Sequence, residues 1–99
     1  MEFRYMGFDQ SENARKYRFD GIARGEPIRH FVVSADLSLF LANRVGIQEG
    51  PTLCADKLTS DLEKGNNGAH ELTADDLRTH AEALAAAEAR KAEARRSRG

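Results

Sequence analysis

Large apolar side chains are distributed unevenly along this chain of 99 residues, and this limits where a core can form. Alanine aside, the sequence has 25 hydrophobic residues, of which 22 lie between Met1 and Leu62. The last 37 residues contribute only Leu72, Leu77 and Leu84. Burying about twenty such side chains at roughly 1.5–3 kcal/mol each is enough to stabilise a small fold. We therefore expect the core to come from the first two thirds of the chain.

Three short segments near the N-terminus are predicted as β-strands. Residues 2–8 are rich in aromatic side chains, but Met6 interrupts the alternation, which indicates a bulge or a strand that is apolar on both faces. Residues 15–23 alternate cleanly, with Tyr17 and Phe19 on one face. The turn residues Gly25 and Pro27 join this segment to residues 28–33, so the two segments should form a hairpin. We expect a small antiparallel sheet of two or three strands.

Two short helices are predicted to cover one face of this sheet. Ser34 is a suitable N-cap for a first helix that ends at Gly46, and Pro51 suits the first turn of a second helix. The second helix should run to about Lys64, since Cys54, Leu58 and Leu62 recur every four residues. Together with the strands this gives a compact α+β domain over residues 1–64, followed by a flexible loop over residues 65–72.

Residues 73–99 are predicted to form a long alanine-rich helix with a frayed basic end. Thr73 is the expected N-cap, and Leu72 and Leu77 have the spacing of a hydrophobic staple. The narrow apolar stripe of Leu77, Ala81 and Leu84 then passes into charged residues. We expect this helix to dock on the domain at its start and to be free at its end.

The charge balance excludes a strong general attraction to polyanions. Lys and Arg number 15 and Asp and Glu number 16, a net charge of −1. Residues 1–48 carry +1, residues 49–87 carry −5 and residues 88–99 carry +3. The apolar runs are too short for a signal peptide or a membrane span. A single cysteine, Cys54, cannot form an intrachain disulfide, so we expect a cytoplasmic protein that does not bind membranes.

Few residues suggest catalysis or metal binding. Cys54 lies near a predicted helix start, where a thiol can become reactive, but its place in the stripe with Leu58 and Leu62 favours a core position. His30, His70 and His80 lack the spacing of zinc ligands. We therefore predict no catalytic residue, no metal and no cofactor, and the motif of a phosphate-binding loop is absent.

The leading functional hypothesis is a non-enzymatic interaction or regulatory module that binds a protein partner, with self-association through the C-terminal helix as one form of it. The predicted contact residues are Leu77, Ala81, Leu84, Lys91 and Arg95. Two alternatives stay open. One is a small nucleic-acid-binding protein, which would use the basic hairpin residues Lys16, Arg18, Arg24 and Arg29 together with the basic end at 90–98. The other is a small thiol-dependent enzyme built on Cys54.

Overall fold

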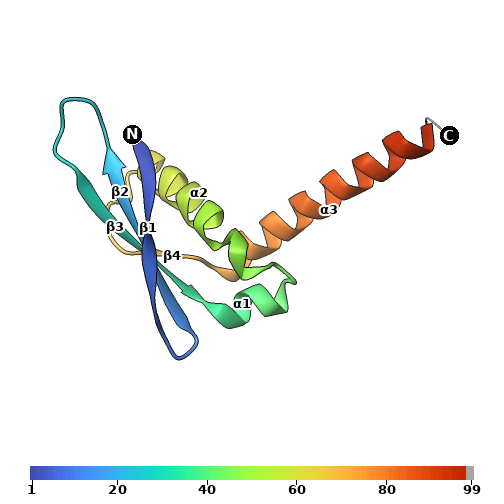
Figure 1. Ribbon diagram of the computed structural model, residues 1–99, viewed down its shortest axis with the longest axis horizontal. Coiled ribbons are helices and arrows are strands. Elements are labelled where there is room, and N and C mark those ends of the chain that lie inside the picture. The colour runs from blue at the N-terminus through green and yellow to red at the C-terminus, as the bar shows by residue number, and fades with distance from the viewer. Residues whose placement is uncertain (98–99) are drawn as a thin grey trace.

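The computed structural model describes residues 1–97 and has the expected α+β architecture (Figure 1). The sheet has four strands in the order β1-β2-β3-β4, so the prediction of two or three strands was too low. In chain order the elements are β1 (Glu2–Ser11), β2 (Ala14–Ile22), β3 (Arg29–Asp36), α1 (Leu37–Ala42), the short 3₁₀ helix η1 (Ile47–Glu49), α2 (Gly50–Glu63), β4 (His70–Glu71) and α3 (Ala74–Ser97).

The first hairpin contains the bulge that Met6 indicated. Tyr5 pairs with Phe19 and Gly7 pairs with Arg18, so Met6 is the extra residue in β1. Gly7 has φ +126°, a backbone conformation that glycine adopts readily. Because of the extra residue, Phe8 falls on the same face as Tyr5, and its ring lies 6.1 Å from that of Tyr17. The strand also runs further than expected, to Ser11.

The second hairpin, β2 and β3, forms as predicted and supplies most of the sheet's buried face. The turn between them contains Gly25 at φ +78° and a backbone hydrogen bond from Glu26 N–H to the Ala23 carbonyl. The hydrophobic residues of β2 and β3 that face the helices and are buried are Tyr17, Phe19, Phe31, Val33 and Ala35. Their alternation with exposed polar residues accounts for the clean sequence pattern.

Strand β4 was missed by the prediction of a loop over residues 65–72. His70 and Glu71 pair in parallel with Val33 and Ser34, and the Leu72 N–H donates to the Ser34 carbonyl at 2.9 Å. The sheet is therefore mixed rather than wholly antiparallel. A two-residue strand has too few residues to show a period of two, and its partner lies far away in sequence.

The first helix is shorter than predicted at both ends. Its N-cap is Asp36 rather than Ser34, and the Asp36 carboxylate accepts a hydrogen bond from the Ser38 N–H at 2.9 Å. The reason is that β3 stays paired with β2 through Ala35 and Asp36, which keeps Ser34 extended. At the other end the helix stops at Ala42 instead of Gly46, because Arg44 adopts φ 55°. By contrast, α2 begins at Gly50 and Pro51 as predicted.

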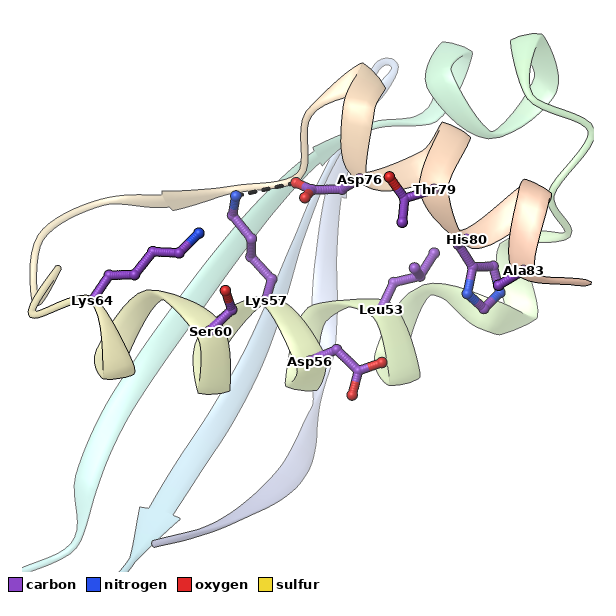
Figure 2. A pocket seen from close by; sticks show the side chains of 9 residues that line it. All are labelled: Leu53, Asp56, Lys57, Ser60, Lys64, Asp76, Thr79, His80 and Ala83. Carbon is purple, nitrogen blue, oxygen red and sulfur yellow. Dashed lines mark ion pairs between the residues drawn. The ribbon is translucent and has the colours of Figure 1, made fainter.

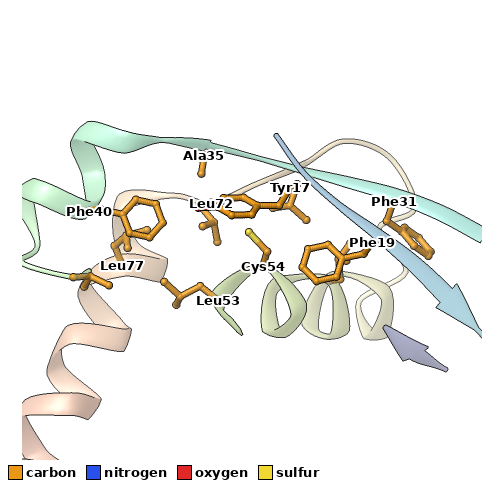
Figure 3. Packing of buried hydrophobic residues seen from close by; sticks show 12 residues of the cluster. Tyr17, Phe19, Phe31, Ala35, Phe40, Leu53, Cys54, Leu72 and Leu77 are labelled. Carbon is orange, nitrogen blue, oxygen red and sulfur yellow. The ribbon is translucent and has the colours of Figure 1, made fainter. Parts of the chain in front are cut away.

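The core lies between the inner face of the sheet and the helices (Figure 3). Cys54 and Leu58 of α2 are fully buried against this face, and Leu72 and Leu77 complete the core beside Phe40. Residues beyond 64 therefore contribute to the same core as the residues before it. Leu72 and Leu77, the predicted staple, are both buried.

Helix α3 begins at the predicted residue and then leaves the domain. The Thr73 hydroxyl accepts from the Asp76 N–H at 3.2 Å, while the Asp76 carboxylate accepts from the Thr73 N–H at 2.9 Å. This reciprocal pair is a capping box with aspartate in place of glutamate. Figure 1 shows the rest of α3 extending away from the sheet. The radius of gyration, 16.0 Å, exceeds the roughly 13 Å of a compact chain of this length.

Candidate functional surface: the projecting helix

The predicted contact stripe on α3 is divided in two by the structure. Leu77 is fully buried in the domain core, and Ala81 is partly buried against it. Leu84 is 43% exposed, and Lys91 and Arg95 are exposed. The first two residues dock α3 on its own domain, so Leu84, Lys91 and Arg95 are the members of the stripe that remain available to a partner.

Beyond Ala81 the helix has almost no tertiary support. Every residue from 82 to 96 is exposed apart from Ala87, which is half-buried. Seven of these fifteen residues are alanine, the strongest helix former, and the others are charged apart from Leu84. The basic residues Arg90, Lys91, Arg95 and Arg96 all lie within the helix. Arg98, the last residue of the predicted basic end at 90–98, lies outside the described residues.

The base of α3 is fixed by an ion pair between Lys57 of α2 and Asp76 of α3 (Figure 2). Lys57 Nζ lies 3.1 Å from Asp76 Oδ2 and 3.7 Å from Asp61 Oδ1. Burial would raise the pKa of Asp76, but hydrogen bonds from the Thr73 backbone, Lys57 and the Thr73 hydroxyl outweigh it and hold the pKa below its usual value. These contacts set the direction in which α3 leaves the domain.

A hydrogen bond between Asp61 and His70 extends this network into the core. His70 Nδ1 lies 2.8 Å from Asp61 Oδ2, and both side chains are buried. The sequence predicted that His70 lies near the end of a flexible loop, because the run of Gly and Asn before it is typical of loops. Nothing in the sequence links residues 61 and 70, since the pairing depends on how β4 lies beside α2. The Asp61–His70 pair fixes this part of the chain against α2.

A groove of about 350 Å³ lies between α2 and α3. Figure 2 shows its walls, to which α2 contributes Leu53, Asp56, Lys57, Ser60 and its C-cap Lys64, and α3 contributes Asp76, Thr79, His80 and Ala83. The Lys57–Asp76 pair occupies one side, and His80 Nε2 lies 3.7 Å from Glu49 Oε2. His80 thus lies beside the α2–α3 contact, as its position next to Leu77 and Ala81 indicated. The two lysines and the two aspartates that line this groove balance in charge.

The four basic residues of the nucleic-acid hypothesis are not gathered on one surface. Lys16 and Arg29 line a common groove. Arg18 instead pairs with Asp9, with 3.3 Å between Nε and Oδ2, and Arg24 is exposed in the connection between β2 and β3. The aromatic residues Tyr17 and Phe19 are buried under the helices, so they offer no face on which bases could stack.

Cys54 has the environment of a core residue. Its side chain is fully buried, and Figure 3 shows it between α2 and the sheet near Tyr17. Burial raises the pKa of the Cys54 thiol to about 12. At neutral pH the group is therefore a neutral thiol rather than a nucleophilic thiolate, and the geometry gives the thiol-dependent enzyme no support.

Within residues 1–97, no three His, Cys, Asp or Glu side chains are grouped so that they could hold a metal ion. Over the same residues, none of the helices is both long enough and apolar enough to cross a membrane.

Comparison of the chain with protein-family models, with curated proteins and with solved structures gave no match.

Proposed function

We propose that this protein is a non-enzymatic interaction module that associates with a second copy of itself through α3. One observation carries the proposal: α3 continues past Ala81, the last of its residues that packs against the core, for fifteen residues through position 96, all of them exposed except the half-buried Ala87. At 1.5 Å per residue this is about 22 Å of helix that is almost entirely surrounded by solvent. A partner would supply the tertiary contacts that this part of the helix lacks.

The charges along α3 favour a second copy as the partner. Residues 74–84 contain three acidic residues and one basic residue, a net charge of −2. Residues 85–96 contain two acidic and four basic residues, a net charge of +2. If two α3 helices pack antiparallel, the basic half of each lies beside the acidic half of the other. The dipoles of the two helices then also point in opposite directions, which is favourable. A parallel pair would place like charges together.

Leu84 is the natural centre of such a pair, since it is the only large apolar residue on the exposed part of α3. With Leu84 of one copy against Leu84 of the other, an antiparallel arrangement brings Lys91 and Arg95 toward the partner's first helical turn. That turn carries Asp75 and Asp76. The proposed contact residues are therefore Leu84, Lys91 and Arg95.

A deletion that preserves the core tests the role of the exposed segment. Removal of residues 87–99 leaves every core residue in place, because the last of these is Leu77. Sedimentation velocity over roughly 10–300 μM, the range for a small and weak interface, should show a monomer–dimer equilibrium for the full chain and a monomer for the shortened one. Thermal melts should show that both fold. If both chains sediment as monomers, or both as dimers, α3 is not the association surface.

A further inference from the structure

The connection between α2 and β4 carries the one Asn-Gly sequence of this chain, Asn67-Gly68. Both residues are exposed and belong to neither a helix nor a strand. Together with Ala69 they line a groove of about 510 Å³ beside the edge of β3. Exposed connections of small polar residues are among the parts of a fold that open most easily. The fold therefore restrains the backbone little at this position, and water reaches it.

A glycine after an asparagine leaves the side-chain amide open to attack by the backbone. The asparagine side chain is short and reaches the backbone of the residues that follow it. Glycine has no Cβ atom, so its amide nitrogen can come close to that side chain. The Gly68 nitrogen can therefore form a bond with Cγ of Asn67, which closes a succinimide ring.

Asn66 holds this connection without blocking the reaction. Its backbone N–H donates to the Asp61 carbonyl at 2.8 Å, and its Oδ1 accepts from the Gly68 N–H at 3.1 Å. The second bond must open before the Gly68 nitrogen can react, and because it is exposed it opens at little cost. A Cβ atom on residue 68 would meet Asn66 Oδ1 at 3.6 Å, an ordinary contact. Alanine therefore fits at position 68.

A second reactive sequence of this chain is protected by the sheet. Asp20-Gly21 is its one Asp-Gly sequence, a type that closes the same ring in unrestrained peptides. Gly21 is buried in β2 and pairs with Phe3 of β1 and with Arg29 of β3. The Asp20 carboxylate is bound to His30, with 2.7 Å between Oδ1 and Nδ1. Pairing on both sides fixes the Gly21 nitrogen and suppresses ring closure.

We propose that Asn67 is a site of spontaneous deamidation and isomerisation in the folded protein. A base removes the proton of the Gly68 N–H, the nitrogen bonds to Asn67 Cγ, and the Cγ–Nδ2 bond breaks to release ammonia, which takes up a proton. Water then opens the succinimide at one of its two carbonyls. Cleavage at Cγ gives aspartate. Cleavage at the backbone carbonyl gives isoaspartate, in which the chain runs through Cβ and Cγ. Both products carry a new negative charge.

The modified chain should keep its fold, because the contacts that hold this connection lie on either side of position 67. On one side Asn66 is bound to the Asp61 carbonyl. On the other side His70 is bound to the Asp61 carboxylate, and β4 pairs with β3. None of the described residues that line the groove is acidic, so the new carboxylate meets no like charge there.

Incubation of the full chain at mildly alkaline pH, followed by peptide mapping, tests the proposal. Trypsin places Asn67 in the peptide 65–78 and Asp20 in the peptide 19–24. The first peptide should gain the mass expected when an amide NH₂ is replaced by OH, and fragmentation should locate isoaspartate at position 67. Asp20 should stay unchanged in the folded chain and isomerise in guanidinium chloride, where the sheet pairing is lost.

Gly68→Ala should slow the conversion of Asn67 by about tenfold, because the added Cβ hinders the approach of the nitrogen. Ala69→Ser, in the same connection but not next to an asparagine, should change the rate by less than about twofold. Thermal melts should show that both variants fold. An Asn67 that stays intact, or one that converts equally fast in Gly68→Ala, overturns the proposal. So does isoaspartate that forms at Asp20 in the folded chain as fast as at Asn67. Sedimentation measures self-association through α3 independently of these results.

Discussion

Lys57 on α2 and Asp76 in the first turn of α3 form an ion pair with 3.1 Å between Nζ and Oδ2. Asp76 also caps its own helix by accepting from Thr73. One carboxylate therefore both starts α3 and ties it to the domain. Because the exposed part of α3 has almost no tertiary contacts of its own, its direction in space depends on these contacts and on the packing of Leu77 and Ala81.

Asp76→Asn should lower the free energy of unfolding at pH 7 by about 1–2 kcal/mol, the range for a lost helix cap together with a partly exposed ion pair. The pKa of Asp76 lies below its ordinary value of 3.8 in the folded protein, so this stabilisation is present above that value. It is lost as the pH falls through the lowered folded-state pKa. Urea unfolding at several pH values measures the effect.

Asp75→Asn is the matched control for this prediction. Asp75 lies in the same helical turn, and its ion pair within residues 1–97 is with Arg78; both side chains are largely exposed. Its replacement should change stability by less than about 0.5 kcal/mol. If Asp76→Asn lowers the free energy of unfolding as much at pH 2 as at pH 7, the stabilisation does not come from the charge of Asp76.

Cys54 should resist alkylation in the folded protein at neutral pH and react readily in urea, because the thiol is buried and its pKa is raised to about 12. Cys54→Ser should destabilise the fold by about 1–3 kcal/mol, since it buries a hydroxyl among apolar side chains. Cys54→Ala should destabilise the fold less than Cys54→Ser does. Labelling of the native protein as fast as that of the unfolded chain would show that the thiol is not a core group.

Gly50 is required where α2 meets the sheet. A Cβ atom at this position would overlap the ring and hydroxyl of Tyr17, which is itself buried. Gly50→Ala should therefore destabilise the protein by about 1–3 kcal/mol, although alanine is the better helix former. Thr52→Ala, at an exposed position in the same turn, is the comparison. A Gly50→Ala variant with a higher melting temperature than the native chain would contradict this packing.

The sequence predicted the elements whose signals are local. The alternation around Tyr17 and Phe19, the bulge at Met6 and the capping residues at Thr73 are each contained within a few neighbouring residues, and the structure has all three. The prediction failed for Ser34 because the pairing of β3 with β2 outweighed its capping propensity.

The parts that could not be predicted depend on residues far apart in the chain. Strand β4 exists only because Val33 and Ser34 lie beside it, and the Asp61–His70 pair follows from this placement. The same holds for the groove at the β3 edge, whose walls come from three separate segments. The stripe on α3 was visible in the sequence, but its division between Leu77 in the core and Leu84 in solvent was not.

In the proposed dimer, the face of α3 centred on Leu84 joins two copies of the chain. Sedimentation velocity of the Leu84→Lys and Ala86→Lys variants tests this association, because both replacements add one lysine at an exposed position of the same helix. Two residues further along, position 86 lies about 200° around the helix from position 84. We predict that Leu84→Lys is monomeric while Ala86→Lys dimerises like the native chain. A native chain that stays monomeric, or a Leu84→Lys variant that dimerises normally, would show that this face of α3 does not join two copies.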